Sequence, residues 1–170
     1  VYRVELLGGL TDNEEGGSRE MARPTMLSQP IWIGPRKAAN RLVYQPMECN
    51  DGDEVGNPSD RTLERYRRLA QAGPGVIFVE SCTVTRESRG RIHELGVSGE
   101  TVDRMAALVE AMREENPEPL ILFQISHDGT RGNPAFTRVA SALPSGDPNV
   151  CTLSAEELEA IEDLFVEAAC

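Results

Sequence analysis

Apolar residues in this chain gather in short uninterrupted runs, separated by segments of mixed polarity. The two clearest runs are Val76–Val79 and Leu120–Phe123, and a third strand-like segment, Arg41–Met47, is stopped by Pro46. An apolar run without alternation is typical of a strand buried on both faces, as in a parallel sheet covered by helices. The pattern therefore predicts three buried strands.

Segments with helical periodicity follow each of these strands. We expect helices over residues 60–72 and 101–115, and a third that opens at the capping box Ser154–Glu157. In the second helix the side chains expected to face the core are Val102, Met105, Ala106, Leu108, Val109 and Met112. In the third they are Leu158, Ile161, Leu164, Phe165 and Ala168. Strands alternating with helices predict an α/β fold with a parallel sheet, and Gln29–Pro35 predicts a short strand pair or cap before it.

Polar or reactive side chains stand at the end of each predicted strand. They are Glu48 and Cys49, then Glu80, Ser81 and Cys82, and finally Gln124, Ser126 and His127. The carboxyl ends of parallel strands meet at one edge of a sheet, where α/β proteins bind their ligands. The sequence thus predicts a site at this edge for a molecule rich in donors and acceptors. A (β/α)8 barrel of the TIM type is built in this way, but three βα units are too few to close one.

Charge and composition exclude several classes of protein. The formal net charge is −11, from 17 Lys and Arg against 28 Asp and Glu, which argues against nucleic acid as a partner. Hydrophobic residues make up 39% of the chain, and no apolar run approaches the ~20 residues that span a bilayer. We therefore expect a globular protein that binds no membrane. The cysteines are widely spaced and form no C-x-x-C pair, which indicates reduced thiols in a cytoplasmic protein.

The first 20 residues differ from the rest of the sequence. Residues 11–20 are acidic and rich in glycine, a composition typical of a linker or a disordered segment. We therefore expect residues 1–20 to be an extension outside the fold, and the domain to occupy residues 21–170, starting at Met21.

Several motifs together resemble one known family. They are Asn40–Met47, Gly75–Ser81, the loop Val84–Arg91, and Phe123–His127 followed by Gly129 and Arg131. In this order and spacing they are similar to the N-terminal portion of the old yellow enzyme or NADH:flavin oxidoreductase family, whose members are FMN-dependent TIM barrels. The resemblance runs from about Pro30 to Ala169 and implies a partial (β/α)8 barrel of about three βα units.

The resemblance also implies which residues would contact FMN. Pro46 and Met47 would offer backbone groups to the flavin ring, and Ser81 would line its polar edge. The Gln124 carboxamide, which both donates and accepts, would hydrogen-bond the pyrimidine end of the isoalloxazine. Glu48 stands where many members carry a Cys or Thr that modulates the flavin potential. An inward carboxylate there would disfavour extra negative charge on reduced flavin.

His127 has two interpretations that the sequence leaves open. The resemblance implies a catalytic group beside the substrate or the flavin, whereas a histidine here also suits the anchoring of its own loop. The turn His127–Arg131 is one residue longer than the family's His-x-Gly-Arg turn, so Arg131 is not assigned a role. Glu48, Glu80 and His127 lack the spacing of metal ligands, and we expect no metal site.

By resemblance, the function is that of an oxidoreductase carrying hydride from NAD(P)H through FMN to an activated alkene or another small-molecule acceptor. The family's later βα units, with the loops that bind the FMN phosphate, have no counterpart in this sequence. The alternative is a catalytically inactive truncated half-barrel or an assembly module that needs a second chain. In both cases we expect a missing C-terminal barrel half, or a homo-oligomer, to complete the structure.

Overall fold

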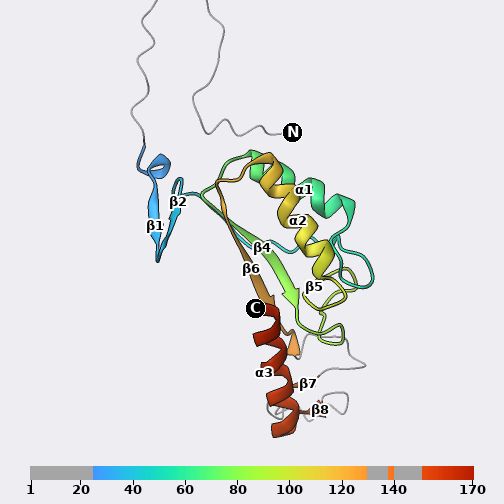
Figure 1. Ribbon diagram of the computed structural model, residues 1–170. Helices are drawn as coiled ribbons and strands as arrows, with labels where there is room; N and C mark the ends of the chain where they lie inside the picture. The colour runs from blue at the N-terminus through green and yellow to red at the C-terminus, as the bar shows by residue number, and fades with distance from the viewer. Residues whose placement is uncertain (1–24, 130–137, 140–150) are drawn as a thin grey trace, which may run out of the picture.

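A parallel sheet forms the centre of the computed structural model, which describes residues 25–129, 138–139 and 151–170 (Figure 1). Strand β4 (Val76–Thr83) lies between β3 (Val43–Tyr44) and β6 (Leu120–Ser126), and all three run parallel. A short strand, β5 (Leu95–Gly96), pairs with the last two residues of β4. The predicted α/β fold is confirmed. The first strand is shorter than predicted, since Pro46 has no N–H to donate to a ladder.

A bulge interrupts β4 at Glu80. Val79 pairs with Phe123 and Ser81 pairs with Gln124, so Glu80 has no partner in the ladder. An extra residue of this kind shifts the alternation of side chains between the two faces of the sheet. Val79 therefore lies in the hydrophobic core together with Cys82, three positions later.

Helices α1 (Asp60–Gln71) and α2 (Val102–Glu115) pack side by side on one face of the sheet (Figure 1). Ser59 and Thr62 form a capping box at the start of α1, which satisfies backbone donors that have no partner within the helix. The core between helices and strands consists of Tyr66, Ala70, Ile77, Val79, Cys82, Leu95, Met105, Leu108 and Met112.

Two of the side chains predicted to face the core from α2 do not. Val102 is 56% exposed, and Ala106 is also exposed. Val102 is the first residue of the helix, where the chain has just left the loop. Ala106 stands one position away from the stripe that carries Met105 and Leu108 into the core. The sequence prediction was therefore wrong at these two positions, because it counted every apolar residue as part of the stripe.

Helix α3 (Ala155–Ala169) begins at the predicted capping box, in which Ser154 and Glu157 bond each other. Figure 1 shows it beyond the carboxyl ends of β4 and β6. No residue of α3 is buried. The half-buried positions include all those predicted to face inward: Leu158, Ile161, Leu164, Phe165 and Ala168. The predicted face is thus correct, but it is only partly covered.

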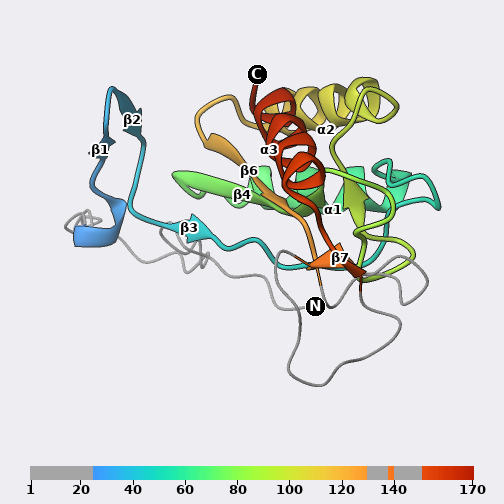
Figure 2. The ribbon, with the colours of Figure 1, turned by 90° about the horizontal axis from the view of Figure 1, so that it is seen from below.

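Further short elements lie outside the main sheet. β1 (Ile31–Ile33) and β2 (Arg36–Ala38) form the antiparallel pair predicted near Gln29–Pro35, and the pair stands apart from the sheet in both views (Figures 1 and 2). A short 3-10 turn, η1 (Met26–Ser28), precedes it. β7 (Arg138–Val139) pairs in parallel with β8 (Cys151–Thr152).

The sheet face that points away from α1 and α2 is open. Val43 is 45% exposed and Leu122 is 42% exposed, whereas their neighbours Tyr44 and Ile121 pack against the core. Within the described residues, β3 and β6 each pair on one side only, with β4. Strands β3, β4 and β6 with their helices therefore form part of a barrel wall that the described residues do not close.

Two further predictions concern the first 20 residues and the absence of a membrane-spanning helix. Residues 1–20 lie outside the described residues, so the extension and the domain start at Met21 stay predictions. In the part of the chain that the structure describes, no helix has the length and apolar character needed to cross a bilayer.

Candidate functional site

The ends of β4 and β6 bring two of the predicted flavin contacts together. Ser81 and Gln124 are partners in the parallel ladder, and Ser126 lies two residues further along β6. The hydroxyl oxygens of Ser81 and Ser126 are 2.6 Å apart, so one hydroxyl donates to the other. Ser81 is buried and Gln124 is exposed. The strand register therefore places a hydroxyl pair beside an accessible carboxamide.

The segment after β3 reaches the same edge. Its position is set by a hydrogen bond from the Cys49 amide to Glu80 Oε2 at 2.8 Å. Pro46 is half-buried and the Met47 side chain is exposed. Ser81 and Gln124 thus lie among the last residues of β4 and β6, and Pro46 and Met47 follow the end of β3, so all four stand near the carboxyl ends of parallel strands.

The first and second βα loops are bonded to each other across this edge. Arg91 Nη1 donates to Glu48 Oε2 at 2.7 Å, and the His93 amide donates to Asn50 Oδ1 at 3.1 Å. The Gly52 amide returns a bond to the His93 carbonyl at 3.0 Å. Because Glu48 is paired, its charge is partly neutralised by the guanidinium. The two loops therefore form one continuous rim beside the strand ends.

Glu94 is a buried carboxyl group at the base of this rim that sequence reasoning missed. Its Oε2 accepts the Gly90 amide at 2.8 Å, and within the described residues its buried Oε1 has no partner. Burial, and then the negative charges of Asp128 and Glu48, raise the pKa of Glu94 to about 7. No sequence signal marks it, since a glutamate in a polar loop is normally exposed.

His127 follows β6 and is half-buried. Its Nδ1 accepts the Gly129 amide at 3.2 Å, which places the imidazole proton on Nε2. Burial lowers the pKa of His127, so the ring is neutral at pH 7. A cavity of about 300 Å³ lies beside it, lined among others by Thr85, Ser88 and Ile161. The bond to Gly129 supports the loop-anchoring interpretation, and among the described residues nothing hydrogen-bonds Nε2.

Two of the three side chains weighed as metal ligands have other partners in the part of the chain that is described. There, no group of three or more His, Cys, Asp or Glu side chains is arranged to hold an ion. Glu48 instead pairs with Arg91, and Glu80 accepts the Cys49 amide. Arg131 lies outside the described residues.

Comparisons with known proteins give consistent matches. Residues 26–170 match the family described as NADH:flavin oxidoreductase / NADH oxidase. The chain is 30% identical over 149 residues to an NADH oxidase from Thermoanaerobacter brockii. It is 26% identical over 155 residues to a metal reductase from Desulforamulus reducens. These matches cover 81% and 85% of this chain but only 22% of each relative, so the chain spans about a fifth of their length.

Solved structures match the fold. The old yellow enzyme from Pichia sp. AKU4542 superposes with a TM-score of 0.76 at 20% sequence identity. The match covers 85% of this chain and 42% of that one. At such identity the likeness concerns architecture alone, and it shows that the described units are arranged as part of a TIM barrel.

Proposed function

Since the chain belongs to the NADH:flavin oxidoreductase / NADH oxidase family, we propose that it contributes the flavin-ring side of an FMN site in an oxidoreductase. The observation that carries the proposal is the meeting of Ser81 and Gln124 at the carboxyl edge of the sheet, beside Pro46–Glu48. FMN, when bound, supplies the hydride chemistry between NAD(P)H and an activated alkene or another small-molecule acceptor.

The polar groups at this edge fit the rim of a flavin ring. Gln124 is exposed, and within the described residues nothing hydrogen-bonds its carboxamide, so a donor and an acceptor face outward together. The Ser81–Ser126 pair uses one hydroxyl proton internally and keeps the other for a ligand. In this proposal Gln124 orients the pyrimidine end of the ring, and the backbone of Pro46 and Met47 borders it.

Glu48 and His127 have secondary roles in the proposed site. Glu48 stands next to the ring as a carboxylate paired with Arg91, so it opposes the charge of a reduced flavin less than an isolated carboxylate does. His127 offers Nε2–H as a donor to the substrate or the flavin, while its Nδ1 holds the turn to Gly129.

The phosphate of FMN needs charge-assisted hydrogen bonds, and two of the three arginines in the second βα loop are already engaged, which leaves only the exposed Arg86. Arg91 is engaged by Glu48, and Arg89 donates to the carbonyls of Ile92 and Glu54. We therefore expect the phosphate contacts from further βα units, supplied by additional sequence, a second chain or a second copy. A catalytically inactive half-barrel is the second candidate function, and the exposed Val43 and Leu122 on the open face favour it.

The test is a titration of FMN into this chain, followed by flavin fluorescence, with NADH oxidation measured in parallel. Without the phosphate contacts, each worth ~1.5–3 kcal/mol, we expect binding weaker than micromolar and no turnover. Q124A should abolish the residual binding. The control Q71A changes an exposed glutamine of α1 that bonds Glu115, and should leave binding unaltered.

Two outcomes count against this proposal. Residual FMN binding that is equal in Q124A and in the unaltered chain would place the flavin elsewhere. Micromolar or tighter binding with NADH turnover would show that the chain, or a homo-oligomer of it, already provides the phosphate contacts.

A further inference from the structure

A buried charge network lies just behind the proposed flavin contacts. It consists of Asp51 from the first βα loop, Arg65 from α1 and Glu80 from the bulge of β4. Arg65 Nε and Nη2 donate to the two oxygens of Asp51 at 3.0 and 2.9 Å, and Nη2 also bonds Glu80 Oε1. The exposed fractions of the side chains are 20% for Arg65, 5% for Asp51 and 1% for Glu80.

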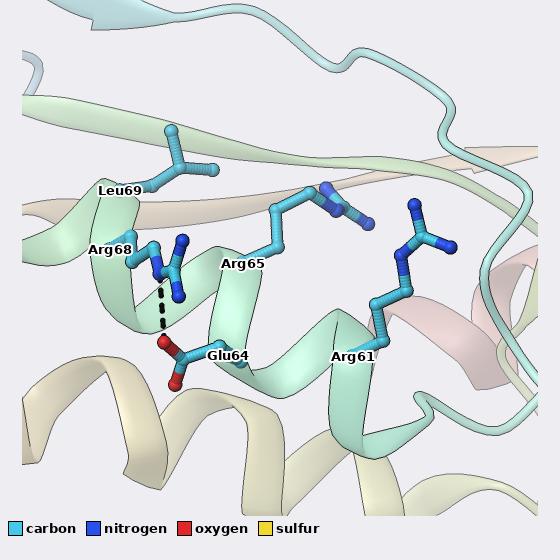
Figure 3. Close-up of a pocket in the computed structure, with 5 residues that line it drawn as sticks. All are labelled: Arg61, Glu64, Arg65, Arg68 and Leu69. Atoms are coloured by element: carbon cyan, nitrogen blue, oxygen red, sulfur yellow. Dashed lines mark hydrogen bonds and ion pairs between the residues drawn. The ribbon is translucent and has the colours of Figure 1, made fainter. Parts of the chain in front are cut away.

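Arg65 is directed to this network by its place on the helix. Figure 3 shows its side chain extending from α1 toward the strands, whereas Arg68 bends back to Glu64. The Arg65 guanidinium also lies 4.5 Å from the ring centre of Tyr66. A cation held by two carboxylates and an aromatic ring is strongly restrained in position. Arg65 therefore serves as a fixed centre between the loop and the strand.

Glu80 connects this centre to both sides of the proposed site. Its Oε2 accepts the amide of Cys49 at 2.8 Å, 31 positions earlier in the chain. Its own amide donates to the Tyr66 hydroxyl at 2.7 Å, a bond that is available because the bulge removes Glu80 from the ladder. The next residue along the chain is Ser81. One buried side chain thus links the segment after β3 to the end of β4.

Asp51 closes the network at the far end of that segment. Its Oδ1 accepts from Thr62 Oγ1 at 2.9 Å, and its carbonyl accepts from the same hydroxyl at 3.0 Å. Thr62 is a member of the capping box that starts α1. The six residues Pro46–Asp51 are therefore held at Cys49 by Glu80 and at Asp51 by α1.

We infer that Glu80 is a positioning residue, which sets the location of Pro46–Glu48 relative to Ser81 and Gln124, with Arg65 and Asp51 holding its carboxylate in place. This inference rests on the proposed function, because the relative positions of Pro46–Glu48, Ser81 and Gln124 matter for catalysis only if a flavin binds to them. Glu80 itself, 1% exposed, does not touch the ligand. Its effect is transmitted through the Cys49 amide and through the peptide bond to Ser81.

Hydrogen exchange at the Cys49 amide tests the link without any flavin. In E80Q, an NH2 group that cannot accept replaces one of the two carboxylate oxygens, and the Arg65 cation is the stronger donor to the oxygen that remains, so the bond to the Cys49 amide is lost. We expect exchange in the peptide around Cys49 to accelerate by about ten-fold or more. E64Q removes the charge of an exposed glutamate that pairs with Arg68 on the same helix, and should leave this exchange unchanged.

A second measurement separates positioning from general loss of stability. The variant L108A weakens the fold from the hydrophobic core, makes no change to the charge network, and should not selectively accelerate exchange at Cys49. The FMN titration is then repeated with both variants. E80Q should weaken FMN binding by about ten-fold or more, and L108A should not. If E80Q does not fold, D51N takes its place, and the same direction of change is expected.

The outcomes distinguish this inference from the proposed function. Unchanged Cys49 exchange in folded E80Q or D51N overturns the positioning role. Accelerated exchange with unaltered FMN affinity also overturns it, because the segment would then move without effect on the site. If the unaltered chain binds no FMN at all, the proposed function fails, and the exchange arm still decides whether Glu80 holds the segment.

Discussion

At the scale of single residues, the unusual groups are buried charges near the carboxyl edge. Glu80 is compensated by Arg65 and by the Cys49 amide, whereas Glu94 has one bonded oxygen and one oxygen without a described partner. A buried carboxylate without full compensation favours its protonated form. Glu94 is therefore the residue whose ionisation should matter most for the stability of the loop rim near neutral pH.

The stability of the protein should depend on pH through Glu94. The pKa of Glu94 is raised from 4.5 to about 7, so between these pH values the folded state holds a proton that the unfolded state has released. The free energy of unfolding therefore falls as the pH rises from 4.5 to about 7. We expect E94Q to be more stable than the unaltered chain at pH 8, by on the order of 2 kcal/mol, with a smaller difference at pH 5. Thermal unfolding at both pH values measures this, with the exposed Glu87 as the control (E87Q). A pH-independent difference would contradict the assignment.

At the scale of elements, the start of β4 is joined to the start of β3 by one side chain. Asn40 Nδ2 donates to the Gly73 carbonyl at 2.7 Å, and Asn40 Oδ1 accepts the amides of Leu42 at 3.0 Å and Gly75 at 2.7 Å. The close approach leaves no room at Gly75, where a Cβ would stand 2.2 Å from the Asn40 carbonyl oxygen. The Asn40 side chain and the absence of a side chain at Gly75 therefore fix the spacing between the starts of the two strands.

Replacing Gly75 by alanine should therefore disturb the pairing of β3 with β4. The added methyl group meets backbone rather than a flexible side chain, so the strands must shift, at a cost of about 1–3 kcal/mol in the free energy of unfolding. Gly99 is the matched control, since a Cβ there meets nothing within 4 Å. Urea unfolding of G75A and G99A measures the difference. Equal midpoints for the two variants would show that the strands adjust without cost.

At the scale of the whole molecule, the open sheet face is the main feature. Val43 and Leu122 are exposed on it, and no residue of α3 is buried. An exposed apolar face together with unpaired strand edges favours association. The part of the barrel wall described here therefore has a surface suited to further βα units or to another copy of the chain.

We expect the isolated chain to associate as its concentration rises, and L122E to reduce that association. A carboxylate on the open face is costly to bury in a contact between copies. V102E introduces the same charge at an exposed valine of α2 and should have little effect. Sedimentation velocity over a range of concentrations gives the result. A chain that stays monomeric throughout would show that the open face needs no cover in solution.

The sequence by itself determined the order of elements and the edge that carries the site. The capping box at Ser154, the uninterrupted apolar strands and the helical periodicity are local signals, read from residues only a few positions apart. The meeting of Ser81 with Gln124 followed from these, because parallel strands necessarily end at a common edge. The family resemblance supplied the candidate cofactor, and its motifs include residues of β3, β4 and β6.

Only the tertiary structure decided the features that join distant residues. The bulge at Glu80, its bond to the Cys49 amide and the burial of Glu94 depend on how the loops and strands pack, and no local pattern encodes them. Val102 was misassigned for the same reason, since its apolar character says nothing about whether a neighbour covers it. Hydrophobic periodicity specifies which face of an element is apolar, whereas desolvation of a given carboxyl or valine depends on everything that surrounds it in space.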